Sequence, residues 1–160
     1  MSNATAFDAD RRVFDELRAE FPSLSFEVRA EPREGLTVDI TVPQQSGLCC
    51  EVALNLCGDE LGLGVGCFWS TWFPSSSLAV VQRYRAAVVG VISGHHRVVE
   101  YRRWGKCIGA DLEAPVEAGW KKIYACRRGF AITWGAARSV VQNQGPSNKA
   151  LHLTGASQTA

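Results

Sequence analysis

The residues of this sequence whose types and spacing could form a binding site are aromatic side chains and an arginine. Residues 68–73 hold four aromatic residues, and Arg103 is followed directly by Trp104. If the strand that carries Arg103 returns along a sheet toward the aromatic run, a guanidinium stands beside an aromatic wall. Such a wall suits a flat or anionic ligand, or an acidic partner protein. We therefore predict a ligand- or partner-binding site made of Trp72, Phe73, Arg103 and Trp104.

An alternative for the aromatic run is that it packs in the core at the end of a sheet, because large aromatic side chains dominate protein cores. Strand alternation places Trp69 and Phe73 on one face and Phe68 and Trp72 on the other. The sequence leaves open whether the run is core or site. The pair His95–His96 follows the far end of the next predicted helix, about 24 Å away, and is predicted to lie outside the site.

The glycine and cysteine patterns favour structural roles. Residues 62–66 read Gly-Leu-Gly-Val-Gly, but they lie inside an alternating pattern typical of a strand, whereas a nucleotide site needs a strand-to-helix turn. A strand face without side chains lets another segment or a neighbouring aromatic ring approach the backbone, and Phe68 lies in the same phase as these glycines. The six cysteines include no CxxC pair and no zinc spacing. We therefore predict reduced thiols that act as small buried apolar residues, with no metal and no cofactor.

The function that these observations favour is non-catalytic binding or protein interaction. The sequence contains no GxSxG elbow and no GxxxxGK[ST] phosphate loop. An alternative is a small enzyme, a hydrolase or transferase that acts on a small molecule. That alternative requires a concave pocket with convergent polar groups.

Charge is divided unevenly along the chain. Residues 1–80 hold 5 Lys and Arg against 12 Asp and Glu, whereas residues 81–160 hold 12 against 4. The two halves could pack together with complementary surfaces, or the second half could present a basic face to an anionic partner. The second interpretation adds nucleic-acid binding as a further alternative. The residues that would carry it are Arg97, Arg102, Arg103, Lys106, Lys121, Lys122, Arg127 and Arg128.

The pattern of apolar residues predicts an α+β fold. Helical spacing predicts helices, and alternation broken by short turns predicts antiparallel strands. We expect an antiparallel sheet, built from a four-stranded meander plus about three further strands, with two helices packed on it. The predicted helices are 6–21 and 78–93, and the predicted strands are 24–30, 36–42, 48–56, 61–69, 97–104, 106–113 and 120–127. Residues 130–141 remain ambiguous, since 130–134 favour a strand while 136–142 could form a helical turn.

The length of 160 residues fits one domain, which we place at 1–142. From residue 143 the sequence becomes small, polar and aperiodic, which predicts a disordered tail over 143–160. No apolar run approaches the roughly 18 residues that span a bilayer. The N-terminus is polar and acidic, unlike a secretory signal, so we expect a cytoplasmic protein that does not bind membranes.

The tail also carries a short recognisable segment. Residues 147–154 read Ser-Asn-Lys-Ala-Leu-His-Leu-Thr. This segment resembles the tails of proteins encoded by integron gene cassettes, in which the reading frame runs into the recombination site of the cassette. The resemblance implies a mobile, accessory bacterial gene, and it implies nothing about fold or activity.

Overall fold

The computed structural model describes residues 3–128 and 133–146. The fold is α+β with antiparallel strands, as the sequence predicts. In chain order the elements are α1 (Asn3–Glu20), β1 (Glu27–Val28), β2 (Val38–Val42), β3 (Val52–Cys57), β4 (Glu60–Val65), β5 (Phe68–Trp72), α2 (Leu78–Ile92), β6 (Arg97–Arg103), β7 (Lys106–Val116), β8 (Gly119–Arg127) and β9 (Ala137–Val141).

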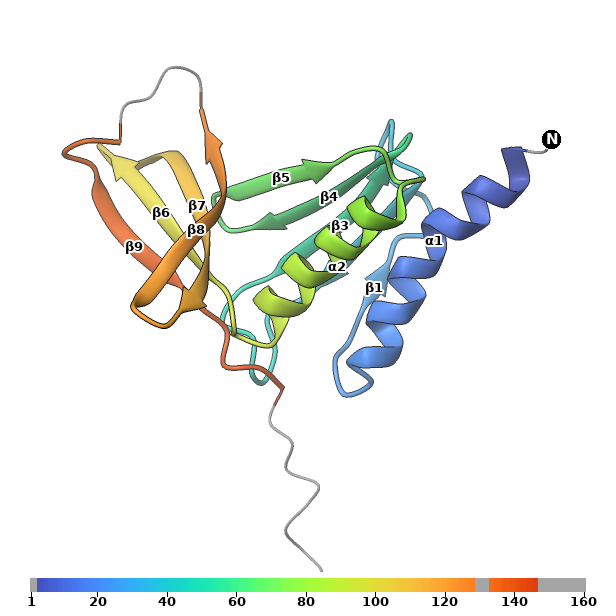
Figure 1. Ribbon diagram of the computed structural model, residues 1–160, viewed down its shortest axis with the longest axis horizontal. Coiled ribbons are helices and arrows are strands. Elements are labelled where there is room, and N and C mark those ends of the chain that lie inside the picture. The colour runs from blue at the N-terminus through green and yellow to red at the C-terminus, as the bar shows by residue number, and fades with distance from the viewer. Residues whose placement is uncertain (1–2, 129–132, 147–160) are drawn as a thin grey trace, which may run out of the picture.

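The strands form two sheets instead of the single predicted sheet (Figure 1). The first has the order β1-β2-β3-β4-β5, and the second has the order β8-β7-β6-β9. Helix α2 carries the chain from the end of the first sheet to the start of the second. The edge strand β5 contacts β7 and β8, so the second sheet packs against the open edge of the first.

The predicted strand 61–69 is divided into β4 and β5. The division falls at Gly66, whose φ of 56° lies in the left-handed region, so Gly66 and Cys67 form the turn of a hairpin in which Val65 pairs with Phe68. Phe68 then faces the core, while Trp69 lies on the opposite face. Alternation alone could not locate this turn, because the apolar residues continue through it in the sequence.

The structure assigns part of the segment 130–141, which the sequence leaves ambiguous. Residues 137–141 form β9, which pairs with β6 from Val98↔Val141 to Arg102↔Ala137. Of the two possibilities left open, the helical turn over 136–142 is excluded, because pairing with the open edge of β6 outweighs the local preference of these residues. Residues 129–132, which include most of the predicted strand 130–134, lie outside the described residues.

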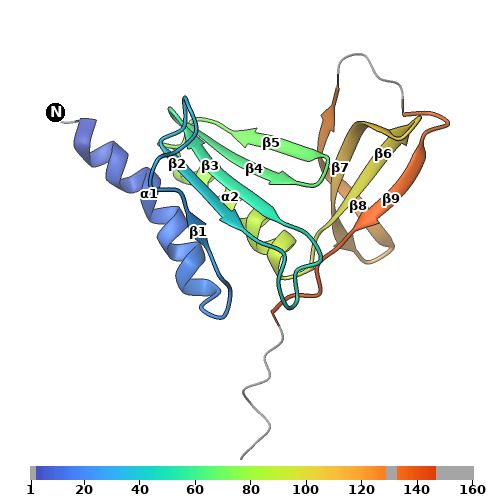
Figure 2. The ribbon, with the colours of Figure 1, turned by 180° about the vertical axis from the view of Figure 1, so that it is seen from behind.

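The main core lies between α2 and the first sheet, with α1 packed beside α2 (Figure 2). Tyr84 of α2 is fully buried and donates its hydroxyl hydrogen to the carbonyl of Gly62 at 3.1 Å. Phe14 of α1 meets the Tyr84 ring edge-on, with the centroids 6.1 Å apart. Trp72 contacts Tyr84 at 5.5 Å and Tyr124 of β8 at 4.9 Å, so its indole joins α2 and the two sheets.

The other face of the first sheet is flat around the glycines of β4. A Cβ added to Gly64 would lie 2.7 Å from the ring of Trp69, and one added to Gly62 would also meet that ring. The Trp69 ring therefore rests directly on the glycine backbone. The glycine face thus allows the close approach that the sequence predicts, but the ring that approaches is Trp69, whereas Phe68 faces the core.

The described chain remains packed beyond the predicted domain end at residue 142. Asn143 is 4% exposed, and its side chain bonds to the amide of Cys49 and the carbonyl of Val91. Gly145 is buried as well. Residues 143–146, the first part of the predicted tail, therefore belong to the packed fold, and residues 147–160 lie outside the described residues.

The six cysteines are free. The prediction that they are buried in the core is wrong. Cys49 and Cys57 are exposed, and the other four are only partly buried. Neither α1 nor α2 is long and apolar enough to cross a membrane.

Candidate binding surface on the second sheet

The structure does not bring the four predicted site residues together. Trp72 is 5% exposed and belongs to the core, while Phe73 is largely exposed beside it. Arg103 and Trp104 lie at the β6–β7 turn. The Trp72 ring packs on the part of β8 that lies level with Val98 of β6 across the second sheet. Val98 precedes Arg103 on β6 by five residues. Five strand residues span about 16 Å, so Trp72 lies near one end of β6 and Arg103 at the other.

Arg103 and Trp104 instead meet a different tryptophan. The guanidinium of Arg103 donates from Nη2 to the carbonyl oxygen of Trp134 at 2.7 Å, which ties the β6–β7 turn to the loop before β9. Lys106 pairs with Arg103, and the amide of Arg128 donates to the carbonyl of Ile108, so both cations lie at the same end of the sheet. We call Arg103, Trp104, Lys106, Arg128 and Trp134 the tryptophan end (Figure 1, upper left).

The backbone of Trp104 is as unusual as its exposure. Trp104 and Gly105 link two paired strands with φ values of 50° and 75°, the pattern of a type I′ hairpin turn. Asn and Gly favour such positions, whereas a bulky residue there costs roughly 1–3 kcal/mol. The Trp104 side chain is 93% exposed, so packing does not offset that cost. Trp134 is 87% exposed on the neighbouring loop.

The face of the second sheet that points away from the core also carries arginines and aromatic rings. It stacks guanidinium groups on aromatic rings: Arg97 lies 4.2 Å from the centroid of Trp120, and Arg127 and Arg138 lie 5.2 and 5.7 Å from that of Tyr101. Cation–π contacts of this kind hold both partners in fixed positions. We call Arg97, Tyr101, Trp120, Arg127 and Arg138 the aromatic–arginine face.

The carboxylates of the second sheet are withdrawn from solvent. Residues 97–141 contain nine Lys and Arg but only four Asp and Glu. Three of the four acids, Glu100, Asp111 and Glu113, are buried, and each is paired with an arginine of the same sheet. The pairs are Glu100–Arg102 at 2.8 Å, Glu113–Arg97 at 2.8 Å and Asp111–Arg127 at 2.6 Å.

This arrangement shows which groups balance the charges of the two halves of the sequence. The buried acids of the second sheet are neutralised within that sheet rather than by the acidic first half. An ion pair that joins the two halves of the sequence does exist, between Arg85 of α2 and Glu20 of α1, but it lies on the helices. The exposed bases Lys106, Lys121 and Arg128 therefore leave the surface of the second sheet positive.

Comparison with known proteins adds no second source of evidence. The chain matches no protein-family model, no curated protein and no solved structure. Every functional argument therefore has to come from the residues and their geometry.

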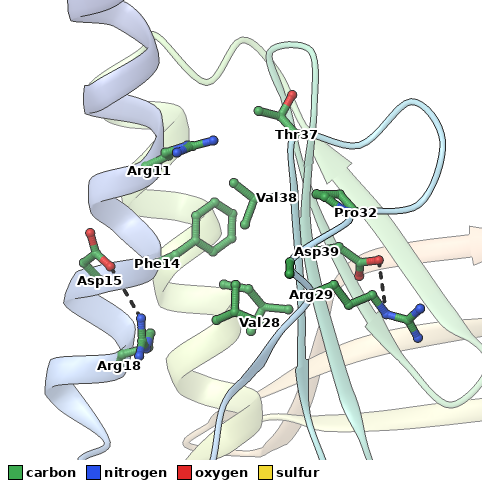
Figure 3. Close-up of a pocket in the computed structure, with 12 residues that line it drawn as sticks. Arg11, Phe14, Asp15, Arg18, Val28, Arg29, Pro32, Thr37, Val38 and Asp39 are labelled. Atoms are coloured by element: carbon green, nitrogen blue, oxygen red, sulfur yellow. Dashed lines mark ion pairs between the residues drawn. The ribbon is translucent and has the colours of Figure 1, made fainter.

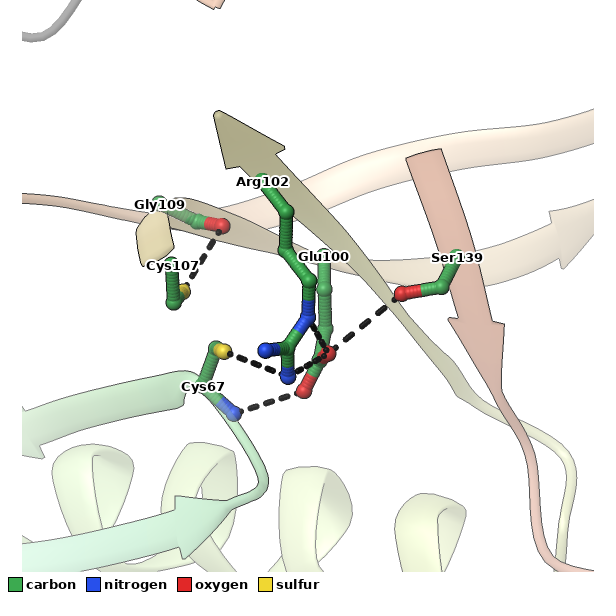
Figure 4. A network of polar contacts seen from close by, with 6 residues as sticks. All are labelled: Cys67, Glu100, Arg102, Cys107, Gly109 and Ser139. Atoms are coloured by element: carbon green, nitrogen blue, oxygen red, sulfur yellow. Dashed lines mark hydrogen bonds and ion pairs between the residues drawn. The ribbon is translucent and has the colours of Figure 1, made fainter. Parts of the chain in front are cut away.

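A network of hydrogen-bonded polar side chains also lies at the junction of the two sheets (Figure 4). Glu100 accepts the amide of Cys67 at 2.8 Å and the guanidinium of Arg102 at 2.8 Å, and Ser139 donates to it at 3.4 Å. Arg102 also donates to the thiol of Cys67 at 3.4 Å. Burial disfavours the ionised form of Glu100, but the Arg102 and Cys67 donors hold its pKa below the usual range.

Two thiols of this region, those of Cys67 and Cys50, are not activated. Burial, followed by the neighbouring Cys107 and Glu100, raises the pKa of Cys67 to about 12. Burial and the adjacent Cys49 likewise raise the pKa of Cys50 to about 12. A thiol with such a pKa is protonated at neutral pH and is a poor nucleophile. The network therefore joins the two sheets, and its Cys67 thiol is not a reactive sulfur.

A pocket of about 420 Å³ lies between α1 and β1–β2 (Figure 3). Phe14, Val28 and Val38 form its apolar side, with Arg18 at its rim. Asp39 also lines it, but its carboxylate accepts two hydrogen bonds from Arg33, at 2.8 and 2.9 Å. The volume suits a small ligand, yet this carboxylate is already bound to the protein itself.

Sequence reasoning found part of the candidate surface and missed the rest. Arg103 and Trp104 belong both to the predicted site and to this surface, whereas His95–His96 follow the end of α2. Trp134 was missed because its segment was ambiguous. One signal could have found it: Trp134-Gly135 repeats the Trp104-Gly105 dipeptide, and Trp-Gly between two strand patterns indicates an exposed turn.

Proposed function

We propose that this chain is a non-catalytic binding protein that holds an anionic macromolecule on the tryptophan end and the adjoining aromatic–arginine face. One observation carries the proposal. Trp104 is almost fully exposed in a backbone conformation that disfavours tryptophan, so neither packing nor local geometry accounts for this residue. A tryptophan that costs stability and contributes no packing is explained by contact with something outside the fold.

The positive surface supplies the charge of the partner. Lys106 and Arg128 lie at the same end of the sheet as the exposed indoles, and three of the four carboxylates of residues 97–141 are buried and paired with arginines. Attraction between opposite charges speeds encounter, and the aromatic contacts then add affinity. An acidic protein and a nucleic acid both satisfy this description.

The alternative that the chain is a small enzyme has less support. Cys67 and Cys50 are the candidate nucleophiles near the polar network. Their raised pKa values disfavour the thiolate. In the pocket beside α1, the Asp39 carboxylate is held by Arg33. Neither place supplies the convergent, unpaired polar groups of a catalytic site.

The proposal is tested with polyanions of known chemistry. Polyglutamate, heparin and oligothymidylate are each titrated against the full chain and against Trp104→Asn at low salt. We expect at least one polyanion to bind, with affinity lowered about tenfold or more by the substitution. Phe73→Ala is the control, because it removes an exposed aromatic from a different place. If no polyanion distinguishes Trp104→Asn from the parent, the proposal is wrong.

Origin and location remain proposals as well. The resemblance of residues 147–154 to cassette-encoded tails supports an accessory role in bacteria. A cytoplasmic location is likewise part of the proposal.

A further inference from the structure

The two exposed tryptophans do not form one apolar patch. Trp104 lies at the β6–β7 turn and Trp134 on the loop that precedes β9, and the side chain of Arg103 connects these two places. Each indole is almost completely exposed, so the two rings do not bury each other. Two separate flat rings, with cations around them, are presented to solvent at one end of the sheet.

The cations around the rings are spaced along adjoining strands. Lys106 follows the turn and Arg128 follows β8, while Arg138 of β9 pairs opposite Tyr101. Lys121 and Lys122 extend the positive charge to the other end of β8. A row of positive charges beside separate aromatic rings matches a chain in which negative charges and flat groups repeat together.

We infer that the anionic partner is single-stranded nucleic acid, with bases stacked on Trp104 and Trp134 and phosphates bound by the surrounding lysines and arginines. The inference rests on the proposed binding function and names its partner. Stacking requires unpaired bases, because a duplex keeps the base faces inside. It requires no particular sequence, since every base has a flat face.

Single strands fit these observations better than an acidic protein does. Aspartate and glutamate would satisfy Lys106 and Arg128, but they have no flat ring to cover two isolated indoles. Protein interfaces favour a contiguous centre that excludes water, with charges depleted there. At the tryptophan end, Lys106 directly follows the Trp104–Gly105 turn, so charge is not excluded from the neighbourhood of the exposed indole.

The test uses a fluorescent oligothymidylate of about 15 nucleotides, a length within the range of single-strand sites. Fluorescence anisotropy is measured with the full chain in about 50 mM salt. Because stacking on an aromatic side chain contributes about 1–3 kcal/mol per base, we expect Trp104→Asn and Trp134→Ser each to weaken binding roughly 5- to 150-fold. If about four phosphates are contacted, raising the salt to about 200 mM should weaken binding roughly 50-fold.

Two matched controls separate specific contacts from general effects. Phe73→Ala removes an exposed ring from the end of β5 and should leave binding unchanged. Arg83→Gln removes an exposed charge from α2, and its effect should be smaller than that of Lys106→Gln at the tryptophan end. Equal losses for Arg83→Gln and Lys106→Gln would show that only net charge matters, and would overturn the inference.

The competing partners give distinguishable results. If polyglutamate binds in a Trp104-dependent manner while oligothymidylate does not, the inference is wrong and the proposed function stands. If a duplex of the same length binds as tightly as the single strand, stacking on unpaired bases is wrong. If neither polyglutamate, heparin nor oligothymidylate responds to Trp104→Asn, both the inference and the proposed function fall.

Discussion

Arg103 donates a hydrogen bond of 2.7 Å to the main-chain carbonyl of Trp134, and this contact fixes one exposed tryptophan relative to another. Arg103 immediately precedes Trp104, so a single guanidinium links the two turns that carry the exposed indoles. Placing two binding side chains in advance lowers the entropy that a partner must overcome. At the tryptophan end, the contact through Arg103 therefore fixes the backbone of the loop that carries Trp134 relative to the turn that carries Trp104.

The first prediction concerns the turn at Trp104. Asn tolerates the left-handed backbone that Trp104 adopts, so Trp104→Asn should unfold at a higher temperature than Trp104→Ala. Both variants lack the indole, and only the first relieves the backbone. We expect a difference on the order of 1 kcal/mol, or about 3 °C in the melting midpoint. Equal midpoints would mean that the turn is not strained by its side chain.

The second prediction concerns Trp72, which the structure places in the core. Trp72→Ala should destabilise the protein by about 3–5 kcal/mol, because it removes a ring that contacts α2 and both sheets. Trp72→Phe is the matched variant. It keeps an aromatic ring and removes an indole nitrogen that is buried without a hydrogen-bond partner, so its cost should be much smaller. Urea unfolding of both variants measures this, and a tolerated Trp72→Ala would contradict the core assignment.

The fate of the predicted site shows what the sequence could supply. Alternation correctly separated Trp72 and Phe68 from Trp69 and Phe73, because that rule depends only on the strand backbone. The pairing of Arg103 with Trp72 failed because it required a single sheet. The division into two sheets depends on how β5 packs on β7 and β8, and no local pattern encodes such a contact between distant strands.

The same distinction explains the other differences. The turn at Gly66 was hidden by the apolar residues around it, whereas the glycine face of β4 was visible because its spacing of two is a strand property. Burial of Glu100 and Asp111 was not predicted. Acidic residues in alternating strands usually face solvent, and only the arginines that pair with them make burial possible.

The third prediction tests the ring that covers the glycine face. A methyl group at Gly64 would lie 2.7 Å from the Trp69 ring, so Gly64→Ala should displace that ring and cost about 1–3 kcal/mol. The double variant Gly64→Ala with Trp69→Ala removes the clash. We expect its stability to exceed the value that the two single variants predict by addition. Simple additivity in a thermal-melt cycle would show that the two residues do not interact.

The fourth prediction concerns acid stability. The Arg33 guanidinium, through its hydrogen bonds, lowers the pKa of Asp39 against the opposing effect of burial. Because the folded-state pKa is below the unfolded value of about 3.9, the contribution of Asp39 is fully present above that pH and is lost as pH falls through the folded pKa. Stability measured between about pH 5 and pH 3 should therefore fall less steeply for Asp39→Asn than for the parent. The same slope in both proteins would contradict this role.

The last prediction concerns the packed segment around Asn143. The Asn143 side chain accepts from the Cys49 amide at 2.9 Å and donates to the Val91 carbonyl at 3.0 Å, so it connects the segment before β3 to the last turn of α2. Its backbone lies against Gly94, and the amide of the next residue, Gln144, donates to the carbonyl of Gly47. Removing the side chain leaves the amide and the carbonyl without this partner.

Asn143→Ala should therefore destabilise the protein by about 1–3 kcal/mol. Two truncations separate this segment from the residues that follow it. A chain that ends at Pro146 keeps every contact of Asn143, and the polar composition of residues 147–160 predicts that it melts with the full-length protein. A chain that ends at Gln142 loses those contacts and should melt several degrees lower, by about 3 °C for each kcal/mol. If both truncations melt together, the packing of Asn143 contributes nothing to stability, and the predicted boundary at residue 142 is the correct one.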